Sequence, residues 1–180
     1  MKVVIGISGA SGVIYGVRLM QSLEADTALV MSKVAKDILR YETDLTVESV
    51  YELADEVFED EDMFASIASG SNRFDAMVIM PCSESTIAKI AHGIADTLIT
   101  RAAAVCLKEN RRLIIVPRET PVSAIMLENE LKLARLGVAI VPASPGFYPK
   151  PKTIEQMIDF VVGRVLDQLG LPNDMFDRWR

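Results

Sequence analysis

Near its amino end the chain reads Val3-Val4-Ile5-Gly6-Ile7-Ser8-Gly9-Ala10-Ser11-Gly12. The apolar first half, Val3–Ile7, predicts a strand that is buried on both faces. The small residues after it predict a tight turn into a helix, where free backbone N–H groups and the positive helix end attract a phosphate. A glycine-rich turn is equally common as a plain connection, so the rest of the chain has to decide between the two interpretations.

The strand-turn-helix pattern of this stretch repeats along the chain. Four further apolar runs predict strands over Ala28–Met31, Ala76–Met80, Leu113–Val116 and Val138–Val141. Apolar residues at helical spacing predict helices over Val13–Ala25, Lys33–Glu42, Ser85–Gly93, Asp96–Glu109, Pro121–Leu136 and Ile154–Leu169. Such alternation is typical of the α/β class, with an open parallel sheet and helices on both faces. Sheets of this kind bind ligands outside the carboxyl ends of their strands.

The composition indicates one ordered domain. The length of 180 residues lies within the roughly 100 to 200 of a single domain, so we expect one domain over 1–180. The net charge is −6, but Glu42–Asp62 alone holds ten acidic and no basic residues, which leaves +4 for the remainder. There is no basic block suited to nucleic acid, and no apolar run approaches the roughly 18 residues of a membrane span. We therefore expect a cytoplasmic protein with neither nucleic acid nor membrane as partner.

Side chains that ligate metals are few. Two cysteines, Cys82 and Cys106, lie in apolar surroundings without C-x-x-C spacing, and His92 is the only histidine. Neither a disulfide framework nor a Cys/His zinc site can be assembled from these three residues. We expect no metal, and interpret the cysteines as small buried hydrophobic residues.

The segment Glu42–Ser71 departs from the regular pattern. It has weak helical periodicity in Thr46–Ala54, followed by the acidic run Glu59-Asp60-Glu61-Asp62. We interpret the segment as an excursion over the sheet edge whose acidic run is a solvated face. The alternative is a magnesium site for a diphosphate, which favours paired carboxylates. Consecutive acids more often repel and solvate than converge, so the first interpretation is preferred.

Polar residues follow the second and third predicted strands. The second strand is followed by Ser32-Lys33, where an NAD site has an acidic residue for the ribose, and no Gly-Lys-Ser/Thr follows the first turn. NAD and nucleoside triphosphates are therefore disfavoured. The third strand is followed by Pro81-Cys82-Ser83-Glu84-Ser85-Thr86, which brings three hydroxyls to a helix start. Ser83 suits an N-cap, and the three hydroxyls together suit a monophosphate.

A charged pair follows the fourth predicted strand, in Pro117-Arg118-Glu119-Thr120-Pro121. Asp, Asn or Gly would make a turn more easily at this point. Because ligands collect at the carboxyl edge of such sheets, we interpret Arg118 and Glu119 as functional rather than structural.

Taken together, these segments resemble one family, the UbiX-type flavin prenyltransferases. The resemblance keeps its order and spacing from Ile5 to Trp179. The segments that carry it are Gly9–Gly12, Ser32-Lys33, Glu42-Thr43-Asp44, Ala68–Ser71, Pro81-Cys82-Ser83, Arg101-Ala102-Ala103, Leu107-Lys108-Glu109, Pro117–Pro121, Leu127-Glu128-Asn129, Pro145–Tyr148 and Asp159–Arg164.

The resemblance implies a flavodoxin-like Rossmann subunit that binds reduced FMN and alkylates it with dimethylallyl monophosphate. The prenyl group joins N5 and then C6 of the flavin, and the product, prenyl-FMN, serves a UbiD-type decarboxylase. The family pattern also implies a homo-oligomer, a homododecamer, with the active site at a subunit junction and Glu42 contributed across it.

The resemblance further assigns roles to individual residues. The residues implied to hold FMN are Gly9, Ala10, Ser11, Ser32, Ser83, Glu84, Ser85, Thr86, Arg101 and Arg118. Those implied to bind the prenyl substrate are Lys108, Tyr148 and Arg164 at its phosphate and Trp179 as a π-face. Glu119 would assist proton movement, and Lys108, Glu42 and Ser11 would join it as catalytic residues.

Elementary chemistry agrees with such a donor set, although each residue also has a structural interpretation. A leaving monophosphate needs fixed cations, and an allylic cation needs a water-excluding, electron-rich pocket. Against this, Lys108 ends a helix, where the dipole favours lysine, and Arg164 lies mid-helix, where its stem can cover apolar surface. Trp179 is equally well explained as a tail residue that seals the core or meets another subunit.

Three other functions compete with prenyl transfer. A flavin-dependent cysteine decarboxylase on the same fold calls for a His before the third strand and an Asn after it, but Ala68–Ser71 and Pro81–Ser85 hold neither. A non-catalytic FMN electron carrier needs no donors for a second phosphate. A direct aromatic-acid decarboxylase would lack a second cofactor to act as electron sink.

Overall fold

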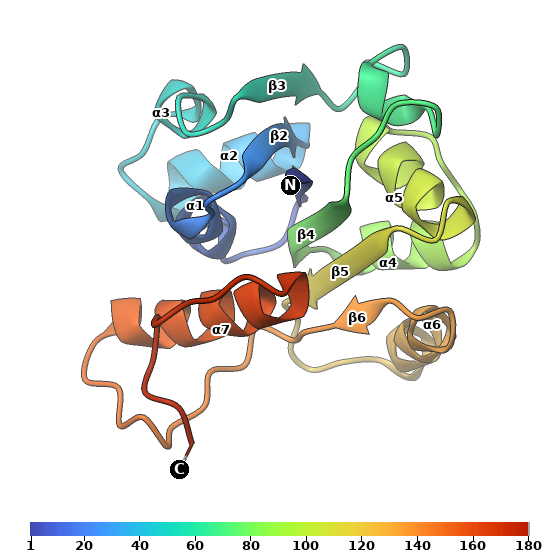
Figure 1. Cartoon of the computed structure of the whole chain (residues 1–180). Helices are drawn as coiled ribbons and strands as arrows, with labels where there is room; N and C mark the ends of the chain where they lie inside the picture. Colours follow the sequence, from blue (N-terminus) through green and yellow to red (C-terminus); the bar gives the residue numbers. More distant parts are fainter. Residues whose placement is uncertain (180) are drawn as a thin grey trace.

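A six-stranded parallel sheet forms the centre of the protein, as a computed structural model of residues 1–179 describes it (Figure 1). The strands lie in the order β3-β2-β1-β4-β5-β6. Without the short edge strand β3, the other five have the flavodoxin order, and the strand order reverses between β1 and β4. The strands are β1 (Lys2–Ile7), β2 (Asp26–Met31), β3 (Glu56–Glu59), β4 (Ala76–Cys82), β5 (Arg112–Pro117) and β6 (Ala139–Ile140).

Helices cover both faces of this sheet, each over its own hydrophobic core. One face carries α1 (Val13–Ser22), α2 (Lys33–Glu42), α3 (Val47–Tyr51) and α7 (Ile154–Leu169). The other carries the 3₁₀ turn η1 (Ser66–Ala68) with α4 (Glu84–Ala91), α5 (Leu98–Lys108) and α6 (Ala124–Arg135). Alternate residues of β1 divide between the cores, because Val3 and Ile5 enter the first and Val4 the second.

A glycine lets the first helix lie close against the sheet. Gly16 faces β4, and a Cβ on it would lie 2.3 Å from the carbonyl oxygen of Met80. No side chain fits at this distance from backbone. The close packing fixes the start of α1, and with it the glycine-rich turn, at the carboxyl edge of the sheet.

The α/β class, the five predicted strands and the six predicted helices are confirmed. Their ends differ by a few residues. The first helix ends at Ser22 rather than Ala25, and the helix predicted from Pro121 begins at Ala124, after the N-cap Ser123. Helix ends fray and turn residues mimic helical spacing, so such shifts are expected.

The segment Glu42–Ser71 contains more structure than its sequence predicts. It forms α3, the unpredicted strand β3 and η1. Within its acidic run, Asp60 is only 7% exposed, so the interpretation of a solvated face is wrong for this residue. Within residues 1–179 no three Asp, Glu, His or Cys side chains converge in a way that suits a metal ion.

Cys82 and Cys106 are free and buried, as expected for small hydrophobic residues, and burial raises the pKa of the Cys106 thiol to about 12.

In the described part of the chain no helix is both long enough and apolar enough to cross a membrane.

Candidate functional site

A cavity of about 550 Å³ opens at the carboxyl ends of β1, β2, β4 and β5, beside the point where the strand order reverses. Pockets of this size hold cofactor-sized ligands. Seven of the residues predicted for the site line it, namely Gly9, Ser32, Ser83, Glu84, Ser85, Thr86 and Glu119. Ser8, Val34, Asp60, Lys89, Thr97, Ile99 and Thr100 complete the wall.

A buried hydroxyl joins the two turns on either side of this cavity. The Ser8 side chain donates to the carbonyl of Pro81 at 3.2 Å and accepts from the backbone N–H of Ser83 at 2.8 Å. Ser8 is only 2% exposed. Together with the backbone N–H of Ser8, which also donates to the Pro81 carbonyl at 3.2 Å, this hydroxyl joins the glycine-rich turn after β1 to the hydroxyl-rich turn after β4. Sequence reasoning did not assign Ser8 to the site.

Helix caps supply hydroxyls to the cavity. Ser83 caps α4 by accepting from the N–H of Thr86, and Ser32 caps α2 by accepting from the N–H of Ala35. A hydroxyl that accepts a backbone N–H keeps its own proton to donate. Both serines can thus cap their helices and donate to an anion, and the positive ends of both helices lie at the same wall.

Asp60 fixes the start of α5 at the same wall. Its carbonyl accepts from the N–H of Leu98 at 2.7 Å, and its carboxylate accepts from the N–H of Ile99 at 2.9 Å. Desolvation by burial raises the pKa of this carboxyl. The sequence signal for this role is a run of acids, which does not distinguish the one buried member from its exposed neighbours.

Arg118, Ser11 and Glu42 meet beside the cavity. The Nε of Arg118 donates to the carbonyl of Ser11 at 3.0 Å, and the Glu42 carboxylate accepts from the N–H of Gly12 at 2.8 Å. Within the chain, Glu42 lies against the first turn; its contribution to a site across a subunit junction, which the family pattern implies, stays a prediction. Ala10, in the same turn, is buried.

The two basic residues of α5 lie away from that cluster. The Nε of Arg101 donates to the carbonyl of Ala68 at 2.9 Å, and Arg101 directly follows the cavity residue Thr100. Lys108, at the other end of α5, is exposed and lies 3.2 Å from the carboxylate of Glu109.

The other residues predicted to bind the prenyl substrate lie on the face of the sheet opposite to α5. Tyr148 lies edge-on to Phe160 of α7, with ring centroids 5.6 Å apart, and edge-on to Trp179, at 5.3 Å. Arg164 lies one turn after Phe160, and its guanidinium pairs with Asp167 at 2.8 Å. The chain thus brings Tyr148, Trp179 and Arg164 to one neighbourhood and leaves Lys108 on the far side of the sheet.

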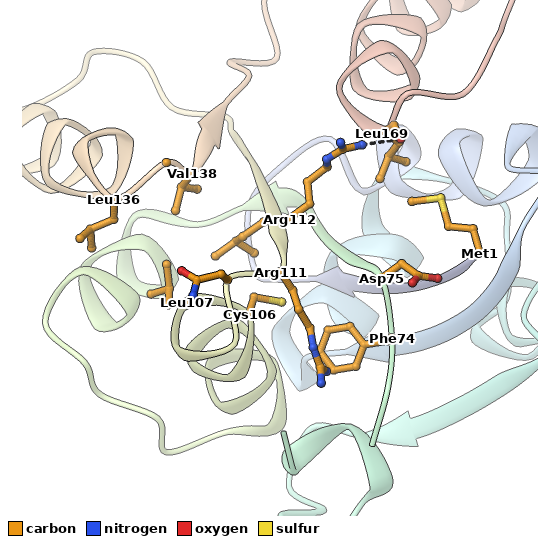
Figure 2. Close-up of a pocket in the computed structure, with 13 residues that line it drawn as sticks. Met1, Phe74, Asp75, Cys106, Leu107, Arg111, Arg112, Leu136, Val138 and Leu169 are labelled. Atoms are coloured by element: carbon orange, nitrogen blue, oxygen red, sulfur yellow. Dashed lines mark hydrogen bonds between the residues drawn. The ribbon is translucent and has the colours of Figure 1, made fainter. Parts of the chain in front are cut away.

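A larger cavity, of about 900 Å³, lies at the amino edge of the sheet (Figure 2). Its two arginines already have backbone partners. Arg111 donates to the carbonyls of Gly70 and Asn72 over the ring of Phe74, and Arg112 donates to the carbonyl of Leu169. These two arginines stabilise the ends of loops and of α7. The carboxyl-edge cavity is therefore the better candidate site.

Comparisons with known proteins identify the family of the chain. The family model described as Flavoprotein matches residues 1–166. Flavin prenyltransferase UbiX of Thermoplasma acidophilum is 56% identical over 180 residues, which cover 99% of this chain and 100% of that protein. The chain belongs to the UbiX family of flavin prenyltransferases. The flavoprotein class and the resemblance seen in the sequence are confirmed.

Solved structures of this family match the whole fold. A dodecameric FMN-dependent UbiX-like decarboxylase from Escherichia coli O157:H7 has a TM-score of 0.98 at 47% identity, covering 100% of both chains. AnUbiX in complex with FMN and dimethylallyl pyrophosphate has a TM-score of 0.97 at 44% identity, covering 99% of this chain and 97% of that one. Peptidyl-cysteine decarboxylase EpiD, at 20% identity, a TM-score of 0.66 and coverage of 93% and 96%, shares the fold alone.

Replacing Ser8 by Ala should loosen the site of this UbiX-family protein. The change leaves the N–H of Ser83 without its partner, which costs about 1–3 kcal/mol of unfolding free energy. FMN affinity should fall with it, because only the backbone bond from residue 8 to the Pro81 carbonyl is left to join the two turns. Urea denaturation and flavin titration measure the two effects. Ser22→Ala, at the far end of α1, is the control and should change neither, and an unaltered Ser8→Ala variant would contradict the role of the hydroxyl.

Asp60 should make stability depend on pH. Its pKa is raised in the folded state above the unfolded value of about 3.9, so the native protein binds the extra proton and loses stability as pH rises through the raised pKa. Asp60→Asn removes this term and should gain stability relative to wild type from about pH 4 to neutrality. Denaturation midpoints across that range test this. Asp60→Ala, without an acceptor for Ile99, should be less stable than Asp60→Asn by about 1 kcal/mol at every pH. A pH-independent difference between Asp60→Asn and wild type would refute the assignment.

Proposed function

We propose that this protein transfers the dimethylallyl group of dimethylallyl monophosphate to N5 and then C6 of reduced FMN, giving prenyl-FMN for a UbiD-type decarboxylase. The observation that carries the proposal is the carboxyl-edge cavity, where Gly9, Ser32 and Ser83–Thr86 come together from three strand ends. Family membership supports the same reaction class. The cytoplasmic location stays a prediction.

The cavity fits FMN in donor type and in space. Ser32, Ser83, Ser85 and Thr86 offer hydroxyls at two helix starts, and Gly9 has no side chain because a Cβ there would lie 2.7 Å from Val34. We assign the FMN phosphate to these donors, together with Arg118 through its free Nη groups. When bound, the reduced flavin supplies the electron-rich nitrogen and carbon that take the prenyl group.

The prenyl phosphate calls for a second set of donors, which one chain does not complete. Tyr148 and Arg164 lie on the α7 face, whereas Lys108 lies on the α5 face, at the helix end away from the carboxyl edge where elements of both faces meet. A site that uses all three draws Lys108 from a different subunit. We therefore propose a homo-oligomer with its active site at a subunit junction. The dodecameric E. coli relative favours a dodecamer.

Proton movement is assigned to carboxylates beside the first turn. Glu119 lines the cavity and is exposed, so it is able to exchange protons with solvent. Glu42 orients the turn through Gly12, and Ser11 is held by Arg118. The carbon–oxygen bond of the donor would break as its carbon bonds to N5, with inorganic phosphate leaving towards the cations. The bond to C6 would consume the prenyl double bond, so the proton that Glu119 accepts from the flavin ring is matched by one delivered to the other alkene carbon.

The competing functions have weaker support. The EpiD likeness carries the fold alone, and this chain has Ser and Glu residues where cysteine decarboxylation calls for His and Asn. Some relatives are described as decarboxylases, but the AnUbiX complex holds a flavin together with a dimethylallyl donor, which favours prenyl transfer. An electron carrier would have no use for Tyr148 and Arg164.

The proposed reaction has a direct test. Purified protein incubated anaerobically with reduced FMN and dimethylallyl monophosphate should yield a flavin heavier by one C5H8 unit, together with inorganic phosphate. Mass spectrometry of the extracted flavin measures the first and a phosphate assay the second. The diphosphate is tested in parallel, because the AnUbiX complex contains it. Unmodified flavin with both donors would reject the proposal.

Arg164→Ala should separate chemistry from flavin binding. Loss of a cation at the leaving phosphate is expected to cost about 10²–10³ in single-turnover rate, by analogy with oxyanion stabilisation. FMN affinity should stay within about twofold, because the FMN donors lie on other elements. Arg164→Lys should recover part of the rate, since a point charge does not reproduce a planar fork. The matched control is Arg40→Ala, which also breaks an Arg–Asp pair three residues apart on a helix. A wild-type rate in Arg164→Ala would show that Arg164 does not bind the leaving phosphate.

A further inference from the structure

Asp167, on the last turns of α7, is shared by three side chains. Arg178 grips it with two parallel bonds, from Nη1 to Oδ2 at 2.7 Å and from Nη2 to Oδ1 at 2.8 Å. Arg164 donates to Oδ2 at 2.8 Å, and the Asn173 amide donates to Oδ1 at 3.0 Å. Arg178 holds the pKa of this carboxyl below its usual range, so it is ionised at neutral pH. No residue role stated above includes Asp167.

The grip of Arg178 on Asp167 fastens the C-terminal tail, residues 171–179, back onto α7. Arg178 also donates to the carbonyl of Asn173 at 3.1 Å and lies over the ring of Phe176, 4.7 Å from its centroid. Phe176 in turn lies on Gly163, where a Cβ would approach the ring to 2.7 Å. The tail therefore packs closely against α7, with the ion pair between Arg178 and Asp167 near its C-terminal end.

The residue after Arg178 is the one that meets the predicted prenyl site. Trp179 is 77% exposed, yet its ring lies 5.3 Å from that of Tyr148 at an interplanar angle of 88°. With so little burial, the position of Trp179 depends on the residue next to it being fixed. Exposed ion pairs usually contribute little, but a bidentate Arg–carboxylate pair with a second donor is the favourable case.

We propose that Asp167 is a positioning residue for the prenyl-phosphate site. Its ion pair with Arg178, which we call the latch, holds the tail so that Trp179 packs against Tyr148. Its contact with Arg164 orients the cation that binds the phosphate. The kinetic part of this inference rests on the proposed function. The latch itself does not, because it concerns only contacts within the chain. Arg178 occupies both carboxylate oxygens and Arg164 only one, so the phosphate can draw Arg164 away while the tail stays fastened.

The chain offers a clean probe of the latch, because Trp179 is its only tryptophan. In the full-length protein, Asp167→Asn should lower the fluorescence anisotropy of Trp179 clearly and raise its acrylamide quenching constant slightly, because the ring is already 77% exposed. The variant should fold, since removing an acid near the negative end of a helix does not disfavour the helix. Asp167→Glu retains the charge and should restore part of the wild-type anisotropy. Arg164→Gln breaks one contact to Asp167 but leaves the fork of Arg178, and should keep it entirely.

The matched control is Asp37→Asn on α2, which removes the partner of Arg40 at the same i,i+3 spacing as the pair of Arg164 and Asp167. It should leave anisotropy, quenching and turnover unchanged. In the prenylation assay, Asp167→Asn should raise KM for dimethylallyl monophosphate about tenfold while FMN affinity stays within about twofold.

The outcomes separate the two levels of the inference. Wild-type anisotropy and quenching in Asp167→Asn would overturn the latch, whatever the enzyme does. A loosened Trp179 with an unchanged KM would overturn the positioning role. If wild-type protein transfers no prenyl group, the proposed function fails, and the fluorescence arm still decides on the latch.

Discussion

Ser8 joins the two turns that line the carboxyl-edge cavity, through its hydroxyl and its backbone N–H. The ladder between β1 and β4 reaches only as far as the pair Gly6 and Ile79. Beyond that pair the backbone N–H of Ser8 still donates to the carbonyl of Pro81 at 3.2 Å, and no loop joins parallel neighbours directly. Ser8 extends the pairing by bridging the carbonyl of Pro81 and the N–H of Ser83. Both helix starts at the cavity depend on this bridge for their spacing.

The sheet imposes a second constraint, because it separates the basic residues of α5 from those of α7. Lys108 and Arg164 belong to helices on opposite faces, and Lys108 lies at the end of α5 away from the carboxyl edge, where elements of the two faces meet. A binding site that needs both must therefore form between chains. In the proposed function, oligomerisation then completes the chemistry rather than merely adding stability.

Periodic elements could be predicted from the sequence, whereas single residues that depart from their neighbours could not. Buried strands such as Val3–Ile7 and amphipathic helices such as Ile154–Leu169 have patterns that a window of residues reveals. Strand β3 was not predicted because its four residues begin and end with exposed glutamates, as suits a sheet edge. Asp60 escaped because its burial depends on the distant N–H groups of α5, which no local pattern encodes.

The family resemblance implies that Arg101 and Arg118 bind FMN, whereas physical reasoning from the sequence singles out only Arg118. The two arginines share a feature that suits a phosphate. Arg118 and Arg101 each use Nε to bind a backbone carbonyl, that of Ser11 and that of Ala68. A guanidinium has five N–H donors, so the outer fork of each stays free while its plane is fixed. Such an arginine meets an anion with little further loss of side-chain entropy, because its orientation is already set. Replacing either arginine by lysine would keep the positive charge but lose the hydrogen bond from Nε to the backbone carbonyl that fixes the orientation of the side chain.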